Sequence, residues 1–516
     1  MWREHDPQSN EAQKVRYEIT RFTRGRGLDL GCGPHKAYPH FIGVDNGHHW
    51  GTKGADVVAD CSNLDVFADG SMEFVFSSHL LEHIQDTEAA LKEWMRVIKV
   101  GGYLVLYLPH KDMYPNIGQP GCNPDHKHDF LPQDIIEHMN HADCGWNLLI
   151  NEDRDTDNGE GEHGNEYSFL MVFRKQDGKK KEHYWNQPKN GKTCCVVRYG
   201  GYGDHLQASS ILPGLKKQGY KITYMTQPEG YAVMRTNPNV DEWFIQDKGQ
   251  VPDNELTPFW NTHKVKYDKW VNLSESVERT LLACEYDSKF DWPVSIRRKY
   301  MDVNYLQFTH ELAEVPYIPE PKFFPTEEEA LLATDFNADK LTGFGILWGL
   351  SGSSLHKFYP WQDQVIARIM KELPEATIVT TGDGACQLLE QGWEKEPRIT
   401  LRAGLWTMRR VLTQAQFSHL VIGPETGVLN AVSHEQNKKV VFLSHSTENN
   451  LTRDWVNTTA MIPNTKIAPC YPCHQLHYNR SVCPRHEETT AAMCAAAIDP
   501  DKVFEVIKAE YDKWSE

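Results

Sequence analysis

Three residues near the N-terminus have the types and the spacing to bind a nucleoside. Gly31 and Gly33 follow the apolar run Gly27–Leu30, and Asp45 closes the next apolar run. Glycines let the backbone approach a ligand where a Cβ would clash, and an acid after the second strand can accept both hydroxyls of a ribose. Tight turns use the same glycines for steric reasons alone. The surrounding elements must therefore show whether these glycines belong to a binding loop or to an ordinary turn.

Those elements continue the pattern. Val57–Cys61 is typical of a strand, with Asp60 near its tip, and Phe74–Ser78 is typical of a strand that leads into a helix. Ala89–Gly102 has the periodicity of an amphipathic helix closed by glycine, and Tyr103–Leu108 is strand-like. Strands that alternate with helices predict a parallel sheet.

This stretch, about residues 20–175, resembles the class I S-adenosylmethionine-dependent methyltransferases that act on small molecules and sugars. The resemblance implies S-adenosylmethionine as the cofactor, although His35 stands where many relatives have a third glycine. The segment Ser78–His83 would line the methionine moiety. The residues assigned to the cofactor are Asp29, Gly31, Gly33, Asp45, Asp60, Ser78 and His79.

Some of these assignments have purely structural alternatives. An acid at a strand end often caps the following helix, which is the alternative for Asp60. His126 and His128 are candidates for taking a hydroxyl proton during methyl transfer. Both histidines could equally be ordinary surface or packed residues.

Two further strand-loop-helix patterns follow in the second part of the chain. Lys192–Tyr199 predicts a strand, and the glycine loop Gly200–Asp204 leads from it into a helix. The pattern restarts with the buried strand Gly343–Gly349 and the polar loop Ser351–Ser354. Two Rossmann-like units in tandem imply a cleft between them.

Residues 192–510 resemble the heptosyltransferase-like glycosyltransferases of family 9, which have the two-Rossmann GT-B fold. The resemblance implies that Asp204 is the catalytic carboxylate. Glu425 replaces the family's Asp, and Asn430 stands where a His is frequent, so the donor's identity stays open. The residues assigned to a nucleotide-diphosphate sugar donor are Ser351, Ser353, Ser354, Lys357, Glu425, Thr426, Gly427 and Asn430.

An inverting glycosyl transfer suits these residue types. It needs a base for the acceptor hydroxyl, and positive charge or N–H groups for the departing diphosphate. Asp204 could be that base, and Lys357 with the helix that begins at Gly427 could hold the diphosphate without an obligatory metal. In the alternative interpretation, Asp204 is a helix cap and Lys357 a surface lysine.

Twelve cysteines in a long chain without an export signal are expected to be reduced. Cys470 and Cys473 have the spacing of two ligands of one tetrahedral ion, and two later cysteines could complete a zinc site. The alternative is a packed cluster of reduced thiols. The candidate ligands are Cys470, Cys473, Cys483 and Cys494.

Length predicts several domains, because 516 residues are too many for one core. The alternation of strands and helices predicts the α/β fold class. The expected architecture is a Rossmann-like methyltransferase domain followed by a GT-B module. A polar, lysine-rich segment at 176–191 is expected to be a linker. The predicted domains are a methyltransferase-like domain at 1–175, an acceptor domain at 192–335 and a donor domain with a cysteine-rich tail at 336–516.

Charge and hydropathy argue against two kinds of partner, nucleic acid and a membrane. A net charge of −17 argues against nucleic acid, whose phosphates demand clustered Lys and Arg. No apolar stretch approaches the ~20 residues that span a bilayer, and the N-terminus lacks a signal-peptide core, so we expect a cytoplasmic protein.

The favoured hypothesis is a bifunctional enzyme that transfers a sugar and a methyl group to a glycan or a related small acceptor. One alternative is a non-catalytic subunit of a larger assembly that retains both folds, since fold does not fix function. Another is modification of a nucleic-acid base. The sequence does not indicate the sugar, the nucleotide, the methylated atom or the oligomeric state.

Overall fold

The computed structural model describes residues 11–48, 51–156, 166–184, 191–274, 280–285, 287–352, 354, 357–476 and 482–516. The chain forms two compact units, and each is described by itself. The first unit contains Met1–Asn190 and Gln246–Lys266, and the second contains Gly191–Ile245 and Tyr267–Glu516. The chain therefore returns to the first unit once after it has entered the second, which the sequence did not indicate.

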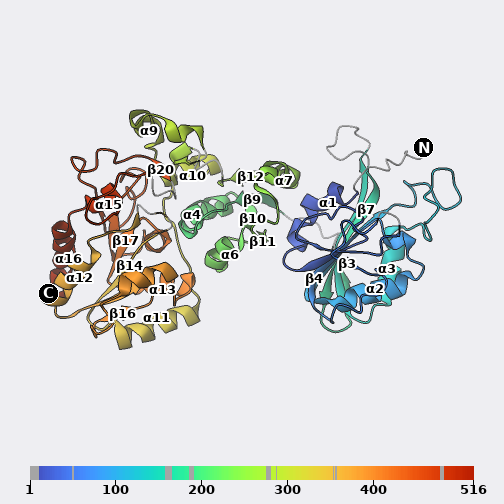
Figure 1. Ribbon diagram of the computed structural model, residues 1–516, viewed down its shortest axis with the longest axis horizontal. Coiled ribbons are helices and arrows are strands. Elements are labelled where there is room, and N and C mark those ends of the chain that lie inside the picture. Colours follow the sequence, from blue (N-terminus) through green and yellow to red (C-terminus); the bar gives the residue numbers. More distant parts are fainter. Residues whose placement is uncertain are drawn as a thin grey trace. The chain divides into compact units, whose positions relative to one another are not determined.

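One mixed sheet runs through the first unit, in the order β3-β2-β1-β4-β5-β7-β6-β8 (Figure 1). Neighbours among β1–β5 pair in parallel, as the sequence predicted, whereas β7 is antiparallel to both β5 and β6. The parallel strands therefore end at one common edge. The strands are β1 (Gly27–Leu30), β2 (Ile42–Asp45), β3 (Val57–Val58), β4 (Met72–Ser78), β5 (Ile98–Pro109), β6 (Gly145–Thr156), β7 (Glu166–Gln176) and β8 (Lys181–His183).

Helices cover both faces of this sheet. Buried side chains of α2 (Thr87–Val97) and α3 (Pro132–Asn140) pack on one face. On the other face lie α1 (Glu11–Ile19) and the short turn η1 (Thr20–Phe22), and α7 (Leu256–Lys264) packs on α1.

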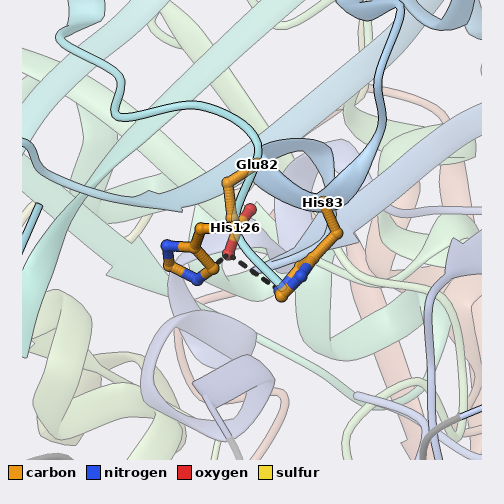
Figure 2. A group of neighbouring side chains, drawn as sticks. All are labelled: Glu82, His83 and His126. Atoms are coloured by element: carbon orange, nitrogen blue, oxygen red, sulfur yellow. Dashed lines mark ion pairs between the residues drawn. The ribbon is translucent and has the colours of Figure 1, made fainter. Parts of the chain in front are cut away.

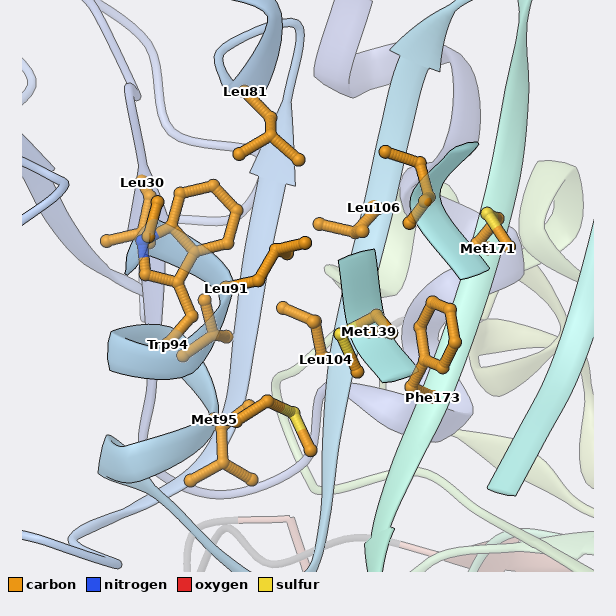
Figure 3. Close-up of a cluster of buried hydrophobic side chains, with 14 of the residues drawn as sticks. Leu30, Leu81, Leu91, Trp94, Met95, Leu104, Leu106, Met139, Met171 and Phe173 are labelled. Carbon is orange, nitrogen blue, oxygen red and sulfur yellow. The ribbon is translucent and has the colours of Figure 1, made fainter. Parts of the chain in front are cut away.

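The core under α2 shows why this helix forms where it does. Asp86 caps its first turn by accepting a hydrogen bond from the Ala89 amide at 3.0 Å. Leu91, Trp94 and Met95 then project from one side of the helix into the cluster drawn in Figure 3. Trp94 is fully buried, and its indole N–H donates to the Cys61 carbonyl at 2.7 Å, so burial leaves no polar atom of this ring unpaired.

Some elements differ from the sequence prediction. In the described residues between β1 and β4 the connections are turns, so helices do not alternate with these strands. The helix expected over 89–102 ends at Val97, because Val97, Ile98 and Val100 favour an extended backbone, and β5 starts directly. Part of the expected linker, Lys181–His183, is an edge strand beside β6. The domain boundaries themselves stay predictions.

The second unit contains two parallel sheets of Rossmann type, with the orders β11-β10-β9-β12 and β16-β15-β14-β17-β18-β19 (Figure 1). In each, the first strand along the chain lies inside the sheet and the order reverses beside it, which creates a ligand-binding crevice at the carboxyl ends. The sequence did not predict β19. The strands are β9 (Lys192–Val197), β10 (Tyr220–Thr226), β11 (Glu242–Ile245), β12 (Lys269–Asn272), β14 (Phe344–Gly349), β15 (Ala376–Thr381), β16 (Ile399–Leu401), β17 (Leu420–Pro424), β18 (Lys438–Phe442) and β19 (Thr458–Met461).

A small parallel pair, β13 (Ala283–Cys284) with β20 (Gln475–Leu476), completes the strands described here. Helices follow the strands in both sheets of this unit. They are α4 (Tyr202–Ala208), α5 (Leu212–Lys217), α6 (Pro228–Met234), α9 (Val294–Met301), α10 (Tyr305–Ala313), α11 (Glu327–Lys340), α12 (Gln362–Glu372), α13 (Met408–Gln416), α14 (Gly427–Ala431), α15 (Met493–Ala496) and α16 (Pro500–Ser515). Within the described ranges, none of the helices is both long and apolar enough to cross a membrane.

Candidate active sites

The loop after β1 requires its glycines. Gly31 and Gly33 have φ angles of 68° and 54°, in the left-handed region that favours glycine. A Cβ on Gly31 would also lie 2.9 Å from the side chain of Leu80. The Gly33 amide donates to the Asp45 carboxylate at 3.0 Å, so the structure brings the predicted glycines and the predicted acid together.

Asp45 is half-buried at the end of β2, and its other oxygen accepts from the Gly47 amide at 2.7 Å. Each carboxylate oxygen can accept more than one hydrogen bond, so the residue can still receive ribose hydroxyls. Asp29, unlike Asp45, is not available to a ligand. It is buried, and its carboxylate accepts a hydrogen bond from the Ala37 amide at 2.7 Å. Burial raises the pKa of Asp29 to about 7. Asp29 therefore holds the shape of the loop.

Asp60 has a structural role. It is exposed, and its carboxylate accepts from the amide and the hydroxyl of Ser62 at 2.8 and 2.7 Å. These bonds close a turn after β3. A contact of Asp60 with the cofactor stays a prediction.

A group of histidines surrounds one buried acid after β4. Glu82 is fully buried in the short turn η2 (Leu81–His83), and its Oε1 lies 3.8 Å from His83 Nε2 and 3.9 Å from His126 Nε2 (Figure 2). His79 Nδ1 lies 3.9 Å from the same oxygen. Burial raises the pKa of the Glu82 carboxyl to about 8, and the charge of Glu11 adds to this effect.

The two histidines predicted as proton acceptors have different surroundings. His126 is buried beside Glu82, whereas the His128 ring lies 3.1 Å from the Ile84 carbonyl and fixes a loop. Ser78, the other predicted residue at this strand end, has a buried hydroxyl without a hydrogen-bond partner among the described residues. Glu82 itself was not singled out from the sequence, because no local spacing connects it to His126.

The second unit contains a cleft of 690 Å³ at the carboxyl ends of both Rossmann sheets. This volume lies in the usual range for ligand sites. The predicted residues that line it are Asp204, Ser351, Lys357, Glu425, Thr426, Gly427 and Asn430. Ser353 lies outside the described residues, and Ser354 is buried with a hydroxyl that has no hydrogen-bond partner in the described part of the chain.

Asp204 is held by three groups. Its Oδ1 lies 3.1 Å from the buried guanidinium of Arg198 and accepts from the Tyr305 hydroxyl at 3.3 Å. Its Oδ2 accepts from the Gly201 amide at 2.8 Å, so the residue also caps α4. One third of its side chain stays exposed to the cleft, and the predicted base is therefore both oriented and accessible.

The turn Glu425–Gly427, called the donor turn here, is held by contacts of its first residue. Glu425 is buried and lies 2.9 Å from His445 Nδ1, and it also accepts from the amide and the hydroxyl of Ser444. Burial alone would raise the pKa of Glu425, but the charges of His445 and Lys357 hold it well below its usual range. Lys357 Nζ donates to the Glu425 carbonyl at 2.8 Å.

Close packing of glycines joins the acceptor loop to the donor turn. A Cβ on Gly203 would lie 2.8 Å from the Asn430 amide nitrogen, and a Cβ on Gly427 would lie 3.1 Å from the Gly203 amide. Asn430 is buried, and its Oδ1 accepts from Gln207 at 2.9 Å. Asn430 therefore connects α14 to α4, a role that was not visible in the sequence.

The cysteines of the tail lie near one another. Burial raises the pKa of the Cys494 thiol, and the neighbouring thiols of Cys483, Cys473 and Cys470 raise it further. Burial likewise raises the pKa of Cys473 to about 12. The carbonyl of Cys473 accepts from the Arg297 guanidinium at 2.7 Å, which holds this loop. A metal among these thiols stays a prediction.

One protein family matches a segment of the first unit. Residues 28–106 match the family described as methyltransferase domain. The chain is therefore a transferase in this part, and the resemblance predicted for its first domain is confirmed. No curated protein matches the chain.

Solved structures resemble both parts of the chain. A glycosyl transferase of family 9 from Veillonella parvula is 15% identical, with 62% of this chain and 97% of that chain covered and a TM-score of 0.44. ADP-heptose LPS heptosyltransferase II of E. coli is 12% identical, with coverages of 63% and 100% and a TM-score of 0.44. A SAM-dependent methyltransferase from Thermotoga maritima, described as a possible histamine N-methyltransferase, is 16% identical, with coverages of 32% and 94% and a TM-score of 0.25.

Proposed function

We propose that the chain is an enzyme with two transferase activities. It transfers a methyl group from S-adenosylmethionine to a hydroxyl of a sugar or small acceptor, and a sugar from a nucleotide-diphosphate donor with inversion. The observation that carries the second activity is the cleft that holds Asp204 and Lys357 at opposed strand ends of two Rossmann sheets. The acceptor is a glycan or a related small molecule.

The loop after β1 fits S-adenosylmethionine, because the positive φ angles of Gly31 and Gly33 form a tight glycine turn at the strand end and the Gly33 amide places Asp45 beside it. When bound, this cofactor supplies an electrophilic methyl group. Asp45 would accept the ribose hydroxyls, and Ser78 with His79 would line the methionine moiety. His126 is the candidate that takes the acceptor's proton as the acceptor oxygen attacks the methyl carbon.

In sugar transfer, Asp204 takes the proton of the acceptor hydroxyl. The acceptor oxygen then bonds to the anomeric carbon, and the bond from this carbon to the diphosphate breaks with its electron pair on the leaving oxygen. Lys357 and the amides at the start of α14 would stabilise that negative charge. Arg198 and Tyr305 orient the base through their contacts with Asp204. Zinc at the four tail cysteines would have a structural role in this proposal.

Ligand-dependent thermal unfolding of the full chain tests both activities. A ligand that binds only the native state at a hundred times its dissociation constant stabilises it by about 2.7 kcal/mol. We expect S-adenosylhomocysteine to raise the unfolding midpoint, and one of ADP, GDP, UDP and dTDP to raise it separately. Transfer of a labelled sugar and a labelled methyl group to a glycan library would then identify the acceptor.

The competing hypotheses give other outcomes. A cooperative transition that none of these ligands moves would contradict both activities and favour the non-catalytic subunit. Stabilisation by S-adenosylhomocysteine together with methylation of a nucleic-acid base would favour the third hypothesis, against which the net charge of −17 argues.

A further inference from the structure

The Glu82 carboxylate is buried beside three histidines. Glu82 is 0% exposed, and neither of its oxygens has a hydrogen-bond partner in the part of the chain that the structure describes. Burial of an ionised carboxylate without partners is strongly unfavourable, so such a group needs either a proton or a bound cation. The positions of the neighbouring histidines favour a bound cation.

The neighbouring nitrogens are spaced as ligands rather than as hydrogen-bond partners. Oε1 of Glu82 lies 3.8 Å from His83 Nε2 and 3.9 Å from His126 Nε2, beyond the range of a hydrogen bond. Ligands at ~2.1 Å from one tetrahedral ion lie about 3.4 Å apart. One ligand atom from each of the three residues lies within 4.8 Å of the other two, and Figure 2 shows all three side chains directed toward one point.

The surrounding backbone holds this arrangement in place. The amides of Lys127 and His128 donate to the Glu82 carbonyl at 2.8 and 3.2 Å, which fixes the loop of His126 on the turn of Glu82 and His83. His79, which has a positive φ of 49°, is oriented by the Ser168 hydroxyl at 2.9 Å from its Nε2, with its Nδ1 toward Glu82.

We propose that Glu82, His83 and His126 bind one divalent metal ion, with His79 beside it. Two imidazoles and one carboxylate suit Mn²⁺, Fe²⁺, Co²⁺ or Zn²⁺ and leave coordination positions open. The ligands follow the ends of β4 and β5, at the sheet edge that carries the cofactor loop. A methyl acceptor is expected to bind at this same edge, beside the cofactor.

This location defines an acceptor class, and that part rests on the proposed methyl transfer. A divalent ion favours ionisation of a hydroxyl that it binds, and two adjacent oxygens can occupy two open positions. The acceptor would be a vicinal diol. Its hydroxyl proton passes to solvent, the oxygen bonds to the methyl carbon, and the carbon–sulfur bond breaks with its electrons on sulfur. His126 would then act as a ligand rather than as the proton acceptor.

Titration of the chelator-treated full chain with Mn²⁺, followed by the electron paramagnetic resonance signal of the unbound ion, tests the site directly. Mn²⁺ prefers oxygen and nitrogen ligands, so the tail thiols should not compete for it. We expect one tight site, and we expect Glu82→Gln and His126→Asn each to weaken binding by at least about tenfold. Glu82→Gln keeps the volume and removes a buried charge, so it should fold, and retained stabilisation by S-adenosylhomocysteine would verify this.

An exposed pair in the same unit provides the matched control. His141 Nδ1 lies 2.7 Å from Glu88 Oε2 on the surface, and Glu88→Gln with His141→Asn should leave Mn²⁺ binding unchanged. Equal affinity in the wild type and Glu82→Gln would overturn the proposal, even if methyl transfer is observed. Tight Mn²⁺ binding that Glu82→Gln abolishes, without any methyl transfer to diols, would support the metal site and contradict the acceptor class.

Discussion

The acids of the two candidate sites have different partners. In the second unit, Asp204 contacts Arg198 and Glu425 contacts His445, so each acid has a basic partner. In the first unit, Asp29 accepts from one backbone amide and Glu82 has no hydrogen-bond donor in the described residues. In the proposed function, the acids of the first unit would bind cations such as a sulfonium or a metal ion, and the basic groups of the second unit would bind a diphosphate.

The largest effect should come from the base in the second unit. Asp204→Asn keeps the size of the side chain but removes its charge and the proton acceptor, and we expect sugar transfer to fall by about 10²- to 10⁴-fold. Nucleotide-induced stabilisation should persist, because the donor contacts lie elsewhere. Steady-state kinetics with the identified donor measure the change, and Asp241→Asn, an acid paired with Lys216 at 2.8 Å, is the control. An equal loss in both variants would contradict the catalytic role.

The glycine loop of the first unit is the next target. Gly31→Ala places a Cβ against Leu80 at a positive φ, so stabilisation by S-adenosylhomocysteine, about 2.7 kcal/mol at a hundredfold excess over the dissociation constant, should be lost. Asp45→Asn should weaken it as well. Gly25→Ala is a matched control, because Gly25 also has a positive φ, of 76°, and meets only the flexible side chain of Glu73. Retained ligand response in Gly31→Ala would argue against this loop as the cofactor site.

Replacing one ionisable group in each site should affect stability differently. Arg198→Met leaves the partly exposed Asp204 without its cation and the Leu273 carbonyl without a donor, and we expect a loss of about 1–3 kcal/mol in the free energy of unfolding. Glu82→Gln, measured after chelator treatment near pH 7, should leave the free energy of unfolding almost unchanged, because burial raises the pKa of this carboxyl to about 8 and keeps it mostly neutral. Chemical denaturation measures the free energy of unfolding of both variants. Similar destabilisation by both substitutions would contradict the proposed difference between the acids of the two units.

The last effect concerns pH. The folded-state pKa of Asp29 is raised to about 7, above its usual value of 3.8, so this carboxyl binds its proton more tightly in the folded state. Its contribution to stability is complete below pH 4 and decreases as the pH rises from about 4 to 7, by at most about 4 kcal/mol. Asp29→Asn should make the first unit's midpoint less sensitive to pH across this window. An unchanged pH profile in the variant would contradict the assignment.

Local patterns in the sequence predicted the strand ends and the loops after them. Gly31, Gly33 and Asp45 could be located because apolar runs, positive-φ turns and terminal acids are all short-range signals. The cleft around Asp204 could be predicted as well, from the tandem Rossmann pattern. Local periodicity carries no signal for contacts between distant segments, so it did not reveal that His126 meets Glu82, that Asn430 bonds to Gln207, or that β7 is antiparallel.

The return of Gln246–Lys266 to the first unit has a consequence for how the chain can be divided. This segment supplies α7, whose Phe259 is fully buried and packs edge-on to Tyr17 of α1, and its Gln250 donates to the carbonyls of Thr20 and Thr23. A truncation after residue 190 would strip these partners and expose an apolar surface on α1. The two units are therefore interlaced along the sequence, and a stable first unit would have to be assembled from two segments rather than by a single truncation.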